Sequence, residues 1–121
     1  MEKSELKHGI KEWLLRIDLV DRRPEEIIAL NFGLFEPYGL ELIGSKVYNL
    51  EDDDWACEED FIPTERTCQG ITFDDNQTWQ EILSMVYSII EELSAELSEL
   101  DLLRVPHITT GFSDGDLLIV K

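Results

Sequence analysis

The sequence predicts a single α+β domain over residues 1–121, folded as a two-layer sandwich in the order α-β-β-α-β-β. Two segments repeat apolar residues at helical spacing, and two others carry paired β-prone runs separated by turn residues. The chain has 121 residues, 43% of them hydrophobic, which is enough for one core. Because neither hairpin can stand alone, we expect both to join one antiparallel sheet with the two helices on one face.

The first predicted helix covers residues 4–18. Its apolar residues recur every three or four positions and form one stripe: Leu6, Ile10, Trp13, Leu14 and Ile17. The pair Arg23-Pro24 then ends the helix, because the residue before a proline is driven out of the α region.

A β-hairpin is predicted next. Apolar and other residues alternate over residues 26–36, and a second run covers residues 40–48. The turn between them is Glu36-Pro37-Tyr38-Gly39, in which proline presets φ and glycine closes the turn. Gly33 and Gly44, inside the strands, indicate a bulge or a close approach of another group to the backbone.

The second half of the chain repeats this order. Residues 49–77 show no sustained period, so we expect an irregular segment with at most one short helical turn. A long helix follows over residues 78–99, where Thr78 and Glu81 have the spacing of a capping box. A second hairpin, residues 108–112 and 117–120, is predicted around Asp114-Gly115. The apolar stripe of the helix consists of Trp79, Ile82, Leu83, Val86, Ile90, Leu93, Leu97 and Leu100.

The charge of the chain is strongly negative and unevenly distributed. Ten Lys and Arg stand against 27 Asp and Glu, a net charge of −17. The first 23 residues are nearly neutral, so almost all of the excess lies in residues 24–121. This charge excludes free binding of DNA or RNA, whose phosphates need Lys and Arg, and binding to anionic membrane surfaces.

The sequence also predicts a cytoplasmic protein. The N-terminal residues alternate charged and polar side chains without the apolar run of a signal peptide, and no stretch reaches the length of a membrane span. Cys57 and Cys68 lack CxxC spacing, which favours free thiols in a reducing compartment.

The densest acidic segment covers residues 51–60, where Trp55 and Cys57 interrupt seven carboxylates and Phe61 follows. One interpretation is a solvated loop whose Trp55 and Phe61 anchor it in the core. The other is a recognition segment, in which an aromatic residue and its acidic neighbours bind a partner. Both hold together if Trp55 packs inward while the acids face the partner. The candidate partner-binding residues are Asp52, Asp53, Asp54, Trp55, Glu58, Glu59 and Asp60.

The second acidic concentration lies at the end of the long helix. Negative charge there opposes the helix macrodipole by about 0.3–1 kcal/mol per exposed residue, and no lysine at i+4 offsets it. This indicates either selection for an anionic surface or a helix held mainly by packing. Repulsion among crowded acids further predicts greater stability at mildly acidic pH than at neutral pH. The candidate partner-binding residues are Glu91, Glu92, Glu96 and Glu99.

The signals for catalysis and metal binding are weak. The sequence has no phosphate-binding glycine loop, GxSxG, HExxH or paired CxxC motif. A Cys57 nucleophile with His107 as base is disfavoured, because the surrounding carboxylates oppose a thiolate. A calcium loop starting at Asp52 would need Gly and Glu where Cys57 and Pro63 stand, which leaves loose binding of divalent cations as the metal alternative. We therefore expect no catalytic residue, no metal site and no cofactor.

Three blocks of the sequence resemble a known class of proteins. They are ALNFGLFE at residues 29–36, YGLELIGSK at residues 38–46 and DDDWACEEDF at residues 52–61. Together they resemble the small acidic immunity proteins of bacterial polymorphic-toxin and contact-dependent growth inhibition systems. The resemblance implies a cytoplasmic bacterial protein that binds a toxin domain, often a basic nuclease, and blocks it. Because these families differ in fold, no set of functional residues is carried over.

We therefore expect a non-enzymatic inhibitor of a basic protein partner, most simply a toxin domain, with no direct contact to nucleic acid or membrane. One alternative is a general interaction or regulatory module with an apolar contact surface. Another is a carboxylate- or metal-dependent hydrolase. The sequence leaves the identity of the partner and the oligomeric state open.

Overall fold

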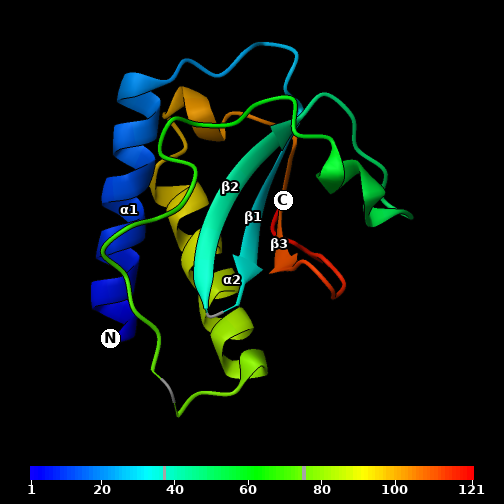
Figure 1. Cartoon of the computed structure of the whole chain (residues 1–121). Helices are drawn as coiled ribbons and strands as arrows, with labels where there is room; N and C mark the ends of the chain where they lie inside the picture. Colours follow the sequence, from blue (N-terminus) through cyan, green and yellow to red (C-terminus); the bar gives the residue numbers. More distant parts are fainter. Residues whose placement is uncertain (37, 75) are drawn as a thin grey trace.

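Helix α1 (Lys3–Val20) and helix α2 (Trp79–Glu96) lie on one face of a four-stranded sheet, as Figure 1 shows. The structure is a computed structural model that describes residues 1–36, 38–74 and 76–121. The α+β class, the two layers and the order α-β-β-α-β-β are confirmed. Two short 3₁₀ helices, η1 (Asp53–Cys57) and η2 (Asp101–Leu103), interrupt the connections.

The sheet contains β1 (Ala29–Phe35), β2 (Gly39–Ser45), β3 (His107–Phe112) and β4 (Leu118–Ile119), in the spatial order β2-β1-β3-β4. Strands β1 and β2 pair antiparallel, and so do β3 and β4, which confirms both predicted hairpins.

The prediction of a fully antiparallel sheet is wrong, because the two hairpins join through parallel strands. Strand β1 pairs parallel with β3, from Ala29 opposite His107 to Leu34 opposite Phe112. Parallel neighbours need a long crossover connection, usually one that contains a helix. The chain between β2 and β3 contains α2, so it provides such a crossover and returns β3 in the direction of β1.

Alternation along the strands separates the two faces of the sheet. Leu30, Phe32 and Leu34 of β1 are fully buried and belong to the core that α1 and α2 complete. Alternate residues, including Asn31 and Gly33, point to the opposite face, which we call the open face. The open face is therefore the surface that the helices leave available.

Helix α1 buries its whole predicted stripe. Helix α2 buries Ile82, Val86, Ile90 and Leu93, whereas Leu83, Leu97 and Leu100 are partly buried and the last two follow the end of the helix. In α2 the capping box is formed, because Thr78 accepts a hydrogen bond from the backbone N–H of Glu81 and Glu81 accepts one from that of Thr78. Trp79, predicted to lie in the buried stripe, is 52% exposed, because at the first helical position it lies beyond the end of the core. Helix α2 ends at Glu96 rather than Glu99.

The connection from β2 to α2 wraps around the edge of the sheet. Isolated bridges join Gly44 to Phe61 and Glu41 to Thr67, so this segment covers the outer edge of β2. A Cβ at Gly44 would lie 3.2 Å from Cβ of Phe61, which confirms the predicted close approach at this glycine. From α1, the indole N–H of Trp13 donates a hydrogen bond of 2.7 Å to the carbonyl of Glu65 and fixes the segment.

Two predicted segments, one turn and one irregular segment, each include a position outside the described residues. In the turn Glu36-Pro37-Tyr38-Gly39 this is Pro37, and in the irregular segment it is Asp75. Next to the first, Tyr38 has a positive φ of 41°, and its ring packs edge-on against Phe112 with ring centroids 6.2 Å apart. No helix in the described ranges is both long enough and apolar enough to cross a membrane.

Candidate functional site: the open face of the sheet

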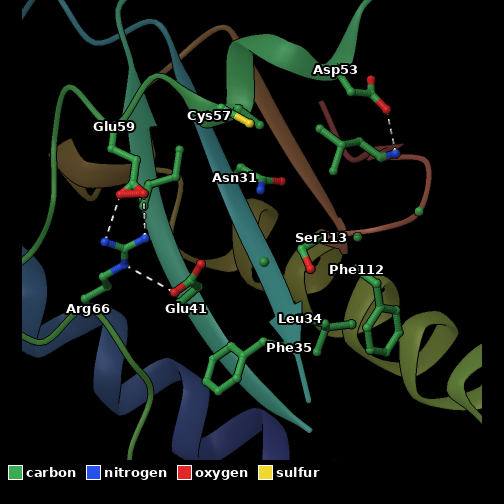
Figure 2. Close-up of a pocket in the computed structure, with 16 residues that line it drawn as sticks. Asn31, Leu34, Phe35, Glu41, Asp53, Cys57, Glu59, Arg66, Phe112 and Ser113 are labelled. Carbon is green, nitrogen blue, oxygen red and sulfur yellow. Dashed lines mark hydrogen bonds and ion pairs between the residues drawn. The ribbon is translucent and has the colours of Figure 1, made fainter. Parts of the chain in front are cut away.

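A hollow of about 290 Å³ lies on the open face, between η1 and the turn that joins β3 to β4 (Figure 2). Gly33 of β1 and Gly111 of β3 lie opposite each other in the register and form the floor of the hollow. Because glycine has no side chain, no side chain of these two residues fills the space above the floor. A Cβ at Gly111 would lie 2.8 Å from the carbonyl oxygen of Asp116, so the turn closes tightly over this strand. Asn31 and Ile43 line the hollow farther along the same face.

The wall of the hollow is held by aspartates of the acidic segment. Asp52 caps η1 by accepting a hydrogen bond of 3.0 Å from the backbone N–H of Asp54. Oδ2 of Asp53 accepts one of 3.1 Å from the backbone N–H of Leu117, as Figure 2 shows. Residues more than sixty positions apart in the chain therefore meet at this wall.

This junction joins η1 to the β3–β4 turn. We call the carboxylates at the start of η1 and those of this turn the acidic rim. Within the described part of the chain, none of these side chains makes an ion pair. The acidic rim consists of Asp52, Asp53, Asp54, Asp114 and Asp116.

Arg66 is the one cation among the residues that line the hollow, and its charge is already paired. Its guanidinium lies 2.8 Å from a carboxylate oxygen of Glu59 and 3.2 Å from one of Glu41, as Figure 2 shows. The hydrogen bond to Glu59 raises the pKa of Arg66 most, burial lowers it, and the bond to Glu41 raises it further. Two carboxylates against one guanidinium leave this side of the hollow negative as well.

Trp55 packs inward, as one of the two interpretations of the acidic segment expected. It is 5% exposed, and its ring centroid lies 5.1 Å from that of Tyr48. Tyr48 stacks in turn on His107, with centroids 3.7 Å apart and ring planes within 6° of parallel. Trp55 and the buried Phe61 therefore anchor the segment on the sheet while its acids remain outside.

The remaining predicted residues of this segment divide into structural and exposed groups. Oδ2 of Asp60 accepts a hydrogen bond of 2.8 Å from the backbone N–H of Lys46 and so holds the chain at the end of β2. Glu59 pairs with Arg66. The side chains of Asp54 and Glu58 are exposed, and neither makes an ion pair or a hydrogen bond through its carboxylate within the described ranges.

The predicted acids of α2 lie on the other side of the sheet and are partly neutralised. Glu92 pairs with Lys3 at 2.7 Å and with Lys7 at 3.0 Å, and Glu96 pairs with Lys7. Helix α2 itself carries no lysine at i+4, as the sequence indicated, but α1 supplies lysine partners across the helix interface. Glu91 and Glu99 are exposed and without an ion pair in the described residues.

Hydrogen bonds from Lys3, Lys7 and Ser88, in decreasing order, lower the pKa of Glu92 to about 2. Such a shift is opposite in direction to the one that repulsion among crowded acids would cause. The two acidic concentrations of the sequence therefore differ in kind: the one on α2 is compensated by α1, whereas the acidic rim is not.

Cys57 is exposed and lines the hollow, and Cys68 is buried. No histidine in the described chain lines the same hollow, since the ring of His107 is stacked on Tyr48. Within the described residues, no three His, Cys, Asp or Glu side chains are grouped so that they could hold a metal ion.

Several residues of this surface were not predicted. The sequence interpretation placed Asp114 and Asp116 only in a turn, and it did not single out Glu41 or Arg66. Asp114 and Asp116 reach this surface through the parallel pairing of β1 with β3, and Arg66 reaches Glu41 because the connection after β2 runs along the edge of that strand. No local pattern in the sequence specifies either contact. The available signal was Gly33, at which the sequence indicated either a bulge or a close approach of another group, and which forms half of the floor.

Comparisons with protein-family models, with curated proteins and with solved structures find no significant match to this chain.

Proposed function

We propose that this chain is a non-enzymatic binding protein that neutralises a cationic protein partner, most simply as an immunity protein that occludes a bacterial toxin domain with nuclease activity. One observation carries the proposal: the hydrogen bond between Asp53 and the N–H of Leu117 gathers acids of two distant segments into one unpaired rim. Asp53 of the rim lines a hollow in which Arg66, the one cation among the described lining residues, already has two carboxylate partners.

The electrostatics support a cationic partner rather than a merely soluble surface. Like charges held together destabilise the folded protein, and Lys or Arg brought by a partner would relieve that repulsion. Some acids elsewhere are paired with the chain's own cations, as Glu92 is with Lys3 and Lys7. An acidic surface left without such cations is what charge complementarity with a basic protein requires.

The mechanism would be occlusion. A nuclease binds phosphates through Lys and Arg, because neutralising the phosphate charges supplies much of its affinity for nucleic acid. Carboxylates of the acidic rim and of Glu58 would occupy those basic side chains and exclude the substrate. Trp55 contributes by anchoring the segment, which limits the ordering cost on binding.

The test uses the C-terminal domain encoded by the reading frame immediately upstream of this gene as the candidate partner. We expect calorimetry to show binding and a nuclease assay to show loss of activity on addition of this protein. The double variant Asp54→Lys/Glu58→Lys should weaken binding by at least about 100-fold, because it sets like charges against the cations of the partner. The variant should still fold, since both side chains are exposed and neither holds the fold. Asp52 and Asp53 are unsuitable for this test because both hold the wall of the hollow.

A matched control reverses the same number of charges elsewhere. Glu25 and Glu26 are exposed and lie in the connection between α1 and β1. Their double lysine variant should bind within about threefold of the unmodified protein. Equal weakening by both double variants would mean that only net charge matters, and absence of binding to the upstream domain would contradict the proposed function.

A second candidate function, an interaction module with an apolar contact surface, is favoured by one observation. Leu19 and Val20, at the end of α1, are 87% and 68% exposed, and they border a hollow that Ile17 also lines. If this surface carries binding, the double variant Leu19→Ser/Val20→Ser should weaken it, while Asp54→Lys/Glu58→Lys should leave it unchanged. The two double variants therefore separate the candidates in one experiment.

A further inference from the structure

A second hollow, of about 340 Å³, adjoins the first and is built around an exposed aromatic ring. Trp79, Phe112, Glu36, Asp114 and Gly115 line it, and Phe112 and Gly115 also line the hollow on the open face. Trp79 is the exposed member of the three tryptophans, since Trp13 and Trp55 are buried. A half-exposed tryptophan that borders a hollow is the residue type most enriched in binding hot spots.

The indole ring is held in place before any ligand arrives. Trp79 packs perpendicular to Phe112, with ring centroids 6.1 Å apart, and Phe112 packs edge-on against Tyr38 on its other side. Phe112 itself is buried at the end of β3. The backbone of Trp79 is fixed by the capping box between Thr78 and Glu81. A ring fixed in this way loses little side-chain entropy on binding.

The two charged residues of this hollow are both carboxylates. Glu36 and Asp114 are exposed and make no ion pair among the described residues. The positive end of α2 lies beside them, but it amounts to only about half an elementary charge, and Glu81 in the first turn opposes it. The net field in the hollow therefore favours a cation.

We propose that Trp79, Glu36 and Asp114 form a receptor for a single arginine side chain of the protein partner, a site that rests on the proposed function and extends it. A guanidinium is planar, stacks on an indole ring and donates to carboxylates in a forked geometry, so it uses all three groups. The volume lies at the lower end of ligand pockets, which suits one long side chain. Because this receptor shares residues with the hollow on the open face, the same partner would contact the acidic rim.

The test is a titration followed by nuclear magnetic resonance on ¹⁵N-labelled protein. The probe is the capped peptide acetyl-Gly-Arg-Gly-amide, and its citrulline analogue is the neutral control of matched size. Each of the three tryptophans gives one indole N–H signal, and the signal of Trp79 is the one that disappears in the variant Trp79→Phe. We expect the Trp79 signal to shift saturably with the arginine peptide, with a dissociation constant of the order of millimolar. The signals of Trp13 and Trp55 should not move.

Variants keep this inference falsifiable. Glu36→Gln/Asp114→Asn should raise the dissociation constant at least about fivefold, whereas Glu25→Gln/Glu26→Gln, which removes the same charge elsewhere, should not. The corresponding lysine peptide, acetyl-Gly-Lys-Gly-amide, should bind more weakly than the arginine peptide, since an ammonium group is not planar and does not stack on the indole ring. Equal shifts with the citrulline or lysine peptide, or equal effects of the two double variants, would overturn the proposal.

Failure of this receptor is distinguishable from failure of the proposed function. If the upstream domain binds and Trp79→Leu leaves that binding unchanged, the receptor is wrong and the function stands. If the arginine peptide binds at Trp79 but the upstream domain does not bind, the receptor stands and the function is wrong. Circular dichroism of Trp79→Leu should show that α2 is retained, because Trp79 is exposed.

Discussion

At the scale of single residues, several charged side chains of this protein hold the backbone in place. Arg23 donates hydrogen bonds to the carbonyls of Asp101, at 2.9 Å, and Ile27, at 3.2 Å, and its side chain is only 9% exposed. Asp53 holds the β3–β4 turn, and Asp60 holds the chain after β2. Charge in this chain therefore has two uses, and only the exposed acids without such contacts are free for a partner.

Arg23 should contribute measurably to stability. It also reaches the carbonyls of Pro24 and Arg104, so Arg23→Ala leaves several acceptors without a donor. We expect urea unfolding to show a loss of roughly 2–3 kcal/mol, the range for hydrogen bonds from a charged group. Arg22→Ala, which removes an exposed neighbour, should change stability by less than about 0.5 kcal/mol. Similar losses in both variants would contradict this role.

The two cysteines should differ strongly in reactivity. The pKa of Cys68 is raised to about 12, chiefly by burial and also by the charge of Glu65, while Arg16 acts in the opposite direction. At pH 8 about one Cys68 in 10⁴ is a thiolate, and the thiol is also shielded, whereas Cys57 is exposed. We expect mass spectrometry to find one rapid alkylation on the native protein, abolished by Cys57→Ser, and two in urea. Two rapid alkylations on the native protein would contradict the buried position of Cys68.

At the scale of elements, α1 acts as the counter-charge of α2. Lys3 and Lys7 of α1 meet Glu92 and Glu96 of α2, so the two helices are joined by charge as well as by their apolar stripes. Helix α1 also contacts the irregular connection, because Arg16 pairs with Glu65. The hydrogen bond from Arg16 lowers the pKa of Glu65. The cations of α1 therefore pair with acids of α2 and of the irregular connection. None of these pairs involves the acidic rim.

This pairing predicts a loss of stability in acid. Because the pKa of Glu92 is lowered from 4.5 to about 2, its contribution is present above pH 4.5 and is lost as the pH falls towards 2. We expect the urea midpoint of the unmodified protein to exceed that of Glu92→Gln at pH 6, with a difference that shrinks below about pH 4.5. Glu91→Gln, which removes an acid without an ion pair in the described chain, should show no such pH-dependent difference. A difference that grows in acid would contradict the assigned pairing.

The elements themselves were largely predictable, because their signals are local. The apolar stripe of α1, the capping box at Thr78 and the turn at Asp114-Gly115 each depend on a few neighbouring residues, and each is confirmed. The direction in which the two hairpins join was not predictable. It depends on how α2 crosses the sheet, and the same local patterns are compatible with antiparallel or parallel pairing of β1 and β3.

At the scale of the whole molecule, the sheet separates two chemically different sides. One side carries the helices and their partly compensated charges, and the other carries the hollow of the open face with the acidic rim. The second hollow lies where the first residue of α2, Trp79, meets the end of β3. The sequence indicated the acidic segment and its anchor Trp55, but not its junction with the β3–β4 turn or the exposure of Trp79. These features arise from contacts between distant residues, which composition and spacing do not contain.

The central claim is that long-range attraction from the acidic rim brings a cationic partner to this side of the sheet. The most direct measurement is the association rate constant with the upstream domain, followed by stopped-flow fluorescence from about 0.02 M to about 0.5 M NaCl. We expect a rate constant well above about 10⁶ M⁻¹s⁻¹ at low salt and a decrease of at least about tenfold over this range. Asp54→Lys/Glu58→Lys should flatten this dependence, whereas Glu25→Lys/Glu26→Lys should change it little. A rate constant that is independent of salt in the unmodified protein would contradict the claim.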